Sequence, residues 1–213
     1  MSTSNMDNTC SSDYFQYNDN KIKISFLGYS GAGKTSLINN YLYGEFKYNV
    51  NSTIGLIHQI QNIFLNDQNI QILISDTSGQ EKFNSIPRSY YRNNDAFVIV
   101  YDITDQLSFN ALKFWIDDVC KYGNENPFIF IVGNKIDIAN EFRVISYDKM
   151  TKFIKDLNIK NIMPYTEVSA KSGLNVQTFM KMVVNTCVVN KKYVKQDNLI
   201  PAQNHENINC CNL

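Results

Sequence analysis

The sequence has no excess of charge of either sign and no long hydrophobic run. Its 213 residues contain 20 Lys and Arg against 20 Asp and Glu, so the overall charge does not favour binding to nucleic acid, which requires a basic surface. No apolar stretch approaches the length needed to cross a bilayer. The length allows one α/β domain with short tails. We therefore expect a cytoplasmic protein, or one attached to a membrane by something other than a helix.

Cysteine usage argues against a disulfide framework. The five cysteines are odd in number and widely spaced, and no secretory signal begins the sequence. Cys120 and Cys187 fall in apolar-periodic helical stretches, where we expect them to pack in the core. Cys210 and Cys211 differ, because they lie side by side in a polar tail.

The chain divides into three parts. Residues 1–20 are rich in Ser, Asn and Asp and lack hydrophobic periodicity, which predicts a disordered extension. Residues 21–190 alternate between strand and helix patterns and form the predicted domain. Residues 191–213 form a variable tail that contains the cysteine pair.

The pattern within 21–190 predicts an α/β fold. We expect strands at 22–28, 55–65, 70–76, 97–101, 128–132 and 164–168, with a turn at 66–69, and helices at 34–43, 107–122, 147–157 and 175–190. The central strands are nearly continuous hydrophobic runs, which is typical of strands covered on both faces. The order predicts a six-stranded, mostly parallel sheet with one antiparallel edge strand and about five helices on both faces. Ligands of such sheets bind at the carboxyl ends of the strands.

The first chemical motif follows the first strand. Residues Gly28–Thr35 read GYSGAGKT and fit the P-loop pattern, in which backbone amides and a helix N-terminus surround phosphate. Lys34 can reach the β- and γ-phosphates, and the Thr35 hydroxyl can bind Mg²⁺. The alternative is a chance glycine-rich turn. The motif predicts a P-loop NTPase fold with phosphate bound by Gly28, Ser30, Gly31, Ala32, Gly33, Lys34, Thr35 and Ser36.

The second motif is Asp76–Gln80, at the end of the third expected strand. Asp76 can hold Mg²⁺ through water, the Gly79 amide can face a γ-phosphate, and Gln80 can orient the attacking water as the catalytic residue. By itself Asp-x-x-Gly is a common turn. Its position after the phosphate loop favours the catalytic interpretation.

Two further motifs predict guanine as the base. In Asn134-Lys135-Ile136-Asp137, the Asp137 carboxylate can accept hydrogen bonds from the guanine N1–H and 2-amino groups. Adenine lacks these donors, and such pairing can discriminate by ~10⁴-fold or more. The backbone amides of Ser169, Ala170 and Lys171 could contact the guanine carbonyl oxygen. The alternatives are a solvated Asn-Lys loop and an unspecific tripeptide.

These four motifs, in this order, resemble those of the Ras superfamily of small GTPases, and within it the Rab family. The resemblance covers about residues 21–190 and the last few residues. The stretches that favour Rab are Ser30, Ser52–Gly55, Tyr90–Arg92, Val100–Asp105, Ser108-Phe109 and Cys210–Leu213.

The resemblance implies further roles. Thr53 would be the switch I threonine that reaches Mg²⁺ and the γ-phosphate, and Phe46 would cover the guanine edge. Lys135 would pack its stem over the base, and Asn134 would tie its loop to the phosphate loop. Residues near 46–54 and 79–92 would be switch loops. Because no Arg occurs in 45–52, we expect slow hydrolysis, accelerated by an activating protein that supplies an Arg.

Some positions depart from the Rab pattern. Ser75 stands where Trp is usual and His58 where Phe is usual, and with Tyr90 these positions form an aromatic trio that Rab partners contact. Two of the three are polar here, so we expect an unusual partner surface. Ser78 and Pro87 could tune switching.

The tail implies membrane attachment. Cys210 and Cys211 match Rab tails that carry two geranylgeranyl groups, which together give a stable anchor, while Lys191, Lys192 and Lys195 add little. The alternative is two unmodified cysteines. The expected protein is a monomer on the cytoplasmic face of membranes that binds GTP and GDP with Mg²⁺. Its expected partners are an exchange factor, an activating protein, effectors of vesicle traffic and a prenyl-binding chaperone.

Two other functions remain open at this point. A nucleotide-binding scaffold with negligible hydrolysis would account for the altered switch neighbourhood, although Lys34, Thr53 and Gln80 are retained. A small P-loop kinase would need an arginine-rich acceptor lid and would not explain the Asn-Lys-x-Asp motif.

Overall fold

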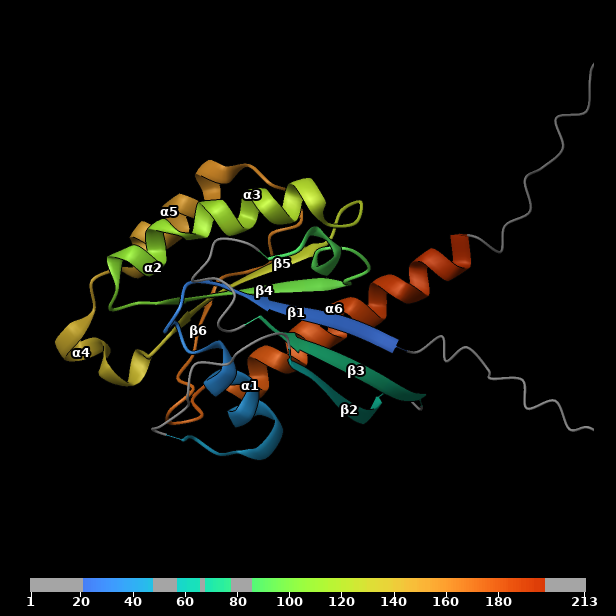
Figure 1. The fold of residues 1–213 in the computed structure, drawn as a ribbon, viewed down its shortest axis with the longest axis horizontal. Coiled ribbons are helices and arrows are strands. Elements are labelled where there is room, and N and C mark those ends of the chain that lie inside the picture. Colours follow the sequence, from blue (N-terminus) through green and yellow to red (C-terminus); the bar gives the residue numbers. More distant parts are fainter. Residues whose placement is uncertain (1–20, 48–56, 66–67, 78–85, 198–213) are drawn as a thin grey trace, which may run out of the picture.

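A computed structural model describes residues 21–47, 57–65, 68–77 and 86–197, with side chains as far as Lys191. The strands are β1 Lys21–Leu27, β2 Ile57–Leu65, β3 Gln68–Asp76, β4 Ala96–Asp102, β5 Phe128–Asn134 and β6 Thr166–Glu167. They form one sheet in the order β2-β3-β1-β4-β5-β6 (Figure 1). Every neighbouring pair is parallel except β2 and β3, which pair antiparallel from Ile57↔Asp76 to Leu65↔Gln68. This confirms the predicted α/β fold.

Helices cover both faces of the sheet. They are α1 Lys34–Tyr43, α2 Gln106–Asn110, α3 Leu112–Tyr122, α4 Ala139–Phe142, α5 Tyr147–Leu157 and α6 Val176–Asp197, with 3₁₀ turns η2 Arg88–Tyr90 and η3 Ile136–Ile138. In Figure 1, α2, α3 and α5 lie on one side of the sheet, and α1 and α6 lie on the other. None of the helices in the described part of the chain is long and apolar enough to span a bilayer.

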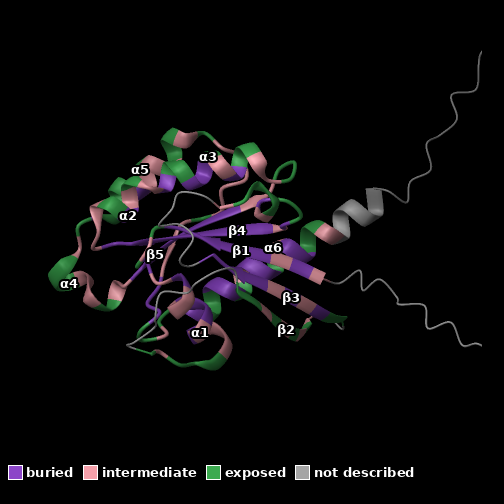
Figure 2. Cartoon of the chain, viewed as in Figure 1, coloured by how far each residue is buried: buried purple, intermediate pink, exposed green. Residues whose placement is uncertain are grey.

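Alternate residues of the central strand β4 supply two separate cores. Ala96, Val98 and Val100 pack with α1 and α6, whereas the residues between them pack with α3 and α5. All seven residues of β4 are buried, as the purple centre of Figure 2 shows. This two-sided burial explains why the strand is a continuous apolar run without alternation.

Several element boundaries differ from those expected. The helix expected over 107–122 is divided at Ala111 into α2 and α3, and the strand expected at 164–168 pairs only at Thr166 and Glu167. Helix α6 continues to Asp197, beyond the predicted domain boundary at residue 190. Of the expected turn 66–69, residues 68–69 belong to β3 and 66–67 lie outside the described residues, as do 55–56 of the second strand.

The cysteine predictions have different outcomes. Cys187 is buried, as expected, but Cys120 is exposed, so its predicted core packing is wrong. The buried positions of α3 are Leu112, Trp115, Ile116 and Val119, and this stripe leaves Cys120 on the solvent side. Helical periodicity marked an apolar stretch, but only packing decides where its buried face ends.

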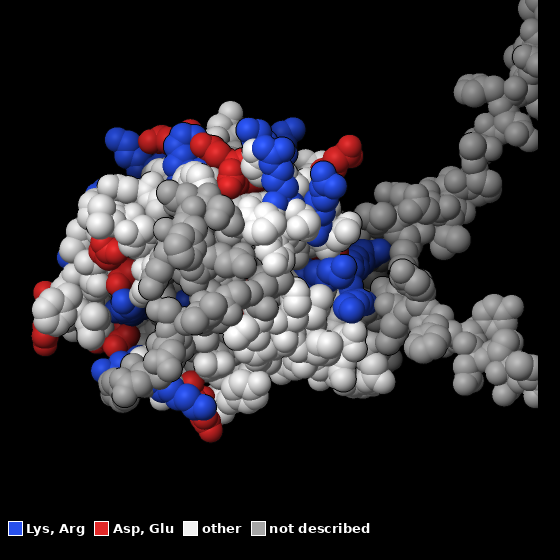
Figure 3. Space-filling view, viewed as in Figure 1, with Lys and Arg blue, Asp and Glu red and all other residues white. Residues whose placement is uncertain are grey.

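Charged side chains of both signs share the surface. Figure 3 shows Lys and Arg next to Asp and Glu along the edge formed by α3 and its neighbours. On α3 itself, Lys113 and Asp117 form an exposed pair at 2.9 Å. This edge is therefore mixed in charge, in keeping with the balanced composition.

Candidate functional site

The loop between β1 and α1 depends on its glycines. Gly28, Gly31 and Gly33 have φ values of 138°, 80° and 94°, a region that side chains disfavour. A β-carbon on Gly28 would also collide with the carbonyl oxygen of Val100 on β4. Gly28 can therefore lie against β4 only because it lacks a side chain.

Lys34 begins α1 and is almost completely buried, with 2% exposure. Its Nζ donates to the carbonyl oxygens of Gly28 at 3.0 Å and Tyr29 at 3.1 Å, so the ammonium group folds over the loop. The N-cap residue of α1 is Gly33, which has no side chain to accept a hydrogen bond from the first turn. A helix N-terminus, a glycine-rich backbone and a buried cation together make a site suited to phosphate.

Thr35 and Asp76 provide oxygen atoms beside this loop. The Thr35 Oγ1 donates to Asp76 Oδ2 at 2.6 Å, and Asp76 is 1% exposed. The two residues meet because β1 and β3 are parallel neighbours, with Phe26 opposite Asp76. Hydroxyl and carboxylate oxygens are ligands that Mg²⁺ prefers, usually together with water and substrate phosphates, so this pair fits the metal.

Asn134 connects three of the motifs. Its Nδ2 donates to the Ala32 carbonyl oxygen at 2.9 Å, and its Oδ1 accepts from the Ala170 backbone N–H at 2.9 Å. The first bond is the expected tie to the phosphate loop. The second bond, to the Ser169–Lys171 segment, was not predicted. One buried amide thus sets the spacing between the phosphate loop and the two predicted base loops, which are residues 134–137 and 169–171.

The proposed base-reading carboxylate is held by a neighbouring motif. Ser169 Oγ donates to Asp137 Oδ1 at 2.7 Å, and Asp137 itself is exposed. Lys135 takes the left-handed conformation at φ 74°, and its Nζ pairs with Asp102 Oδ2 at 2.5 Å. The Asp137 side chain is therefore oriented while it stays open to a ligand.

The structure describes only some of the remaining predicted site residues. Ser30, Ser36 and Phe46 are half-buried, and Lys171 is exposed in the turn after β6. Outside the described residues lie Thr53, Gly79, Gln80, Cys210 and Cys211. Their roles remain predictions.

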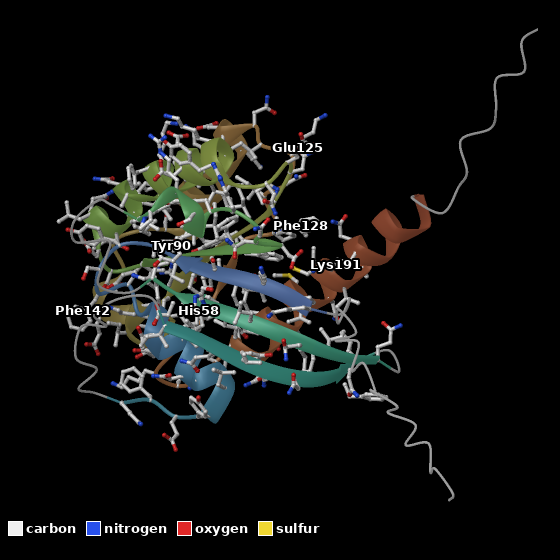
Figure 4. The ribbon with its side chains drawn as sticks, turned by 45° about the vertical axis from the view of Figure 1, so that its right-hand side comes forward. His58, Tyr90, Glu125, Phe128, Phe142 and Lys191 are labelled. Atoms are coloured by element: carbon white, nitrogen blue, oxygen red, sulfur yellow. The ribbon has the colours of Figure 1, made fainter. Side chains whose placement is uncertain are left out.

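The two residues that depart from the Rab pattern, His58 and Ser75, contact each other. His58 on β2 lies opposite Ser75 on β3, and His58 Nδ1 lies 2.9 Å from Ser75 Oγ. His58 is exposed, Ser75 is buried, and Tyr90 of η2 is half-buried; Figure 4 shows His58 and Tyr90. The two polar side chains therefore form a hydrogen-bonded pair.

A side-chain network beside the base loops was missed by sequence reasoning. Tyr101 of β4, Tyr165 and Glu167 beside and within β6, and Arg143 after α4 are joined by hydrogen bonds. Tyr101 and Tyr165 are 64 residues apart. Tyr101 lies in the stretch Val100–Asp105, which resembles Rab, but Tyr165 belongs to none of the motifs found in the sequence. No local pattern could have signalled the contact.

Comparison with protein families agrees with this geometry. The model of the Ras family matches residues 23–189. The matched span contains the phosphate loop, Asp76 and both base loops.

Proposed function

The chain belongs to the Ras family and is a GTP-binding small GTPase switch, and we propose that it is a Rab-type regulator of membrane traffic with slow intrinsic hydrolysis. The observation that supports guanine-nucleotide binding is the pair of hydrogen bonds that Asn134 makes, one donated to the Ala32 carbonyl oxygen and one accepted from the Ala170 N–H. They hold the phosphate-binding and base-binding halves of one site at a set distance. A guanine nucleotide would bridge these halves.

At the base, Asp137 would accept hydrogen bonds from the guanine N1–H and 2-amino groups. Ser169 already donates to one oxygen of this carboxylate, which reduces the orientational freedom lost on binding. Adenine would offer this carboxylate no matching donors. The proposed preference for guanine follows from this difference.

At the phosphates, Lys34 would exchange its bonds to the Gly28 and Tyr29 carbonyl oxygens for phosphate oxygens. Thr35 and Asp76 would hold Mg²⁺, whose chemistry is to neutralise charge on the β- and γ-phosphates. We propose that Gln80 positions the attacking water and that Thr53 closes over the γ-phosphate. The absence of Arg from residues 45–52 leaves this segment without an arginine finger of its own.

Single-turnover hydrolysis of bound GTP tests this mechanism. Wild type should hydrolyse slowly, Gln80→Leu should be slower still, and an activating protein that supplies Arg should accelerate wild type by ~10³–10⁵-fold. Gln68→Leu serves as the matched control, because it makes the same substitution at an exposed glutamine, at the end of β3 away from Asp76. Equal, near-zero rates for wild type and Gln80→Leu would favour the nucleotide-binding scaffold instead.

We propose that Cys210 and Cys211 carry two prenyl groups that attach the protein to the cytoplasmic face of a membrane. One lipid chain gives marginal attachment, whereas two give a stable anchor. Imaging of the tagged protein should show membrane signal that the double variant Cys210→Ser, Cys211→Ser loses. Unchanged membrane signal in that variant would contradict the anchor, and a single variant with partial loss would show that both cysteines contribute.

The proposed partners are effectors that read the GTP-bound switch surface. The His58–Ser75 pair presents hydrogen-bonding groups where Rab chains usually present aromatic rings. We propose that this surface selects partners with polar side chains opposite His58. Exchange factors, activating proteins and prenyl-binding chaperones are the other proposed partners of the monomer.

A further inference from the structure

We propose that Tyr101 and Tyr165 are positioning residues for guanine recognition, because the hydrogen bond between their hydroxyls fixes the strands that present the two base loops. The inference rests on the proposed reading of guanine by Asp137. Neither tyrosine would touch the nucleotide. Both would act through the backbone of β5 and β6.

The two hydroxyls meet at one level of the sheet. Tyr101 lies opposite Gly133, and Gly133 lies opposite Glu167, so β4, β5 and β6 are in register there. The Tyr101 and Tyr165 oxygens are 2.5 Å apart, and their rings stack with centroids 6.3 Å apart. A β-carbon on Gly133 would collide with the Tyr165 hydroxyl and crowd that of Tyr101. The hydroxyl pair therefore lies directly against the backbone of β5.

The direction of the hydrogen bonds follows from the charges around them. Arg143 donates to both oxygens of Glu167, at 2.8 and 2.7 Å. Burial would raise the pKa of Glu167, but the bonds from Arg143 and Tyr165 outweigh it and lower that pKa. Burial raises the pKa of both tyrosines, so their hydroxyls are protonated near neutral pH.

Tyr165 has a single proton, and it donates this proton to Glu167 Oε1 at 2.8 Å. Tyr101 must then be the donor in the bond between the two hydroxyls. The chain of donors runs from Tyr101 to Tyr165 to the ionised Glu167. Because it ends on a charge, each bond in it is strengthened relative to a bond between neutral groups.

This network is continuous with the base loops. Gly133 directly precedes Asn134, and the Val168 N–H donates to the Gly133 carbonyl oxygen at 2.8 Å. The Ile136 N–H donates to the Val168 carbonyl oxygen at 3.3 Å, which joins the segments that contain Asp137 and Ser169. Lys34, Thr35 and Asp76 lie on α1 and β3, away from this network. Loss of the hydroxyl bond should therefore disturb the base end of the site and leave the phosphate end in place.

The experiment compares dissociation of GDP with that of inosine diphosphate, which keeps N1–H but lacks the 2-amino group. Rates are measured from the Mg²⁺ complexes of wild type, Tyr165→Phe, Tyr101→Phe and the double variant. Wild type should release inosine diphosphate faster than GDP. Each single variant should narrow the ratio of the two rates by about three- to tenfold, the worth of one hydrogen bond. The double variant should add little to Tyr165→Phe, because Tyr165→Phe has already removed the bond that Tyr101→Phe breaks.

Tyr147→Phe is the matched control. Its ring packs against Tyr165 with centroids 5.1 Å apart, but it is 52% exposed, so its hydroxyl is not part of the buried chain. Its rate ratio should equal that of wild type.

A purely structural role for the tyrosines would change both dissociation rates by the same factor. That result, or an unchanged ratio in both single variants, would overturn the inference while leaving guanine recognition intact. Equal release of the two nucleotides by wild type would instead overturn the reading of the 2-amino group by Asp137, and the inference with it.

Discussion

At the scale of single residues, the end of β1 has the strictest requirement. Gly28 combines φ 138° with a position where a β-carbon would meet the backbone of Val100. Gly31, three residues later, has φ 80°, but no described atom lies within 4 Å of where its β-carbon would be. Gly28 thus combines steric contact with the sheet and an unfavourable backbone conformation, whereas Gly31 has the unfavourable backbone conformation alone.

Substitution of these two glycines should therefore have different costs. Gly31→Ala should lower the free energy of unfolding by about 1 kcal/mol, the cost of a left-handed residue. Gly28→Ala should lower it by more than about 2 kcal/mol, because a backbone carbonyl cannot yield as a side chain would. Urea unfolding of the nucleotide-free proteins measures both values. Equal losses would show that the contact with Val100 is relieved by movement of the loop.

At the scale of elements, β6 is short and is held by side chains as well as by its backbone. Both of its residues pair with β5, but a strand of this length contributes few backbone hydrogen bonds. The two bonds from Arg143 to Glu167 join it to the segment before α5. Because the Glu167 side chain is only 15% exposed, solvent screens this pair less than a surface pair.

This contact predicts a dependence of stability on pH. The pKa of Glu167 is lower in the folded protein than its ordinary value, so the stabilisation is present above that ordinary value. It is lost as the pH falls through the lowered, folded-state pKa. Denaturant unfolding between pH 7 and pH 3 should show wild type losing more stability on acidification than Glu167→Gln. Parallel losses in the two proteins would show that other carboxylates dominate.

At the scale of the whole molecule, the site is assembled from loops that follow β1, β3, β5 and β6. The two halves of the site pack on different parts of the sheet, and Asn134 links them. A ligand that contacts both halves must stabilise the complete fold, because unfolding of either half abolishes its binding.

Thermal unfolding should therefore report the nucleotide that binds. Mg²⁺ with GDP at ~1,000 times its dissociation constant should stabilise the protein by ~4 kcal/mol and raise Tm. Mg²⁺ with ADP at the same concentration should shift Tm far less, because it cannot pair with Asp137. An equal shift with both nucleotides would contradict base recognition and leave phosphate binding unaffected.

The sequence by itself determined the phosphate loop, the order of strands and helices and the positions of the motifs, because each depends on local patterns of glycine, charge and hydrophobicity. Only the tertiary structure decided that Asn134 also holds the Ser169–Lys171 segment, that Tyr101 reaches Tyr165, and that Cys120 faces solvent. Such contacts depend on sheet order and on the depth of helix packing, and both are set by interactions between residues far apart in the chain. The network of Tyr101, Tyr165, Glu167 and Arg143 therefore depends on β4, β5 and β6 lying side by side.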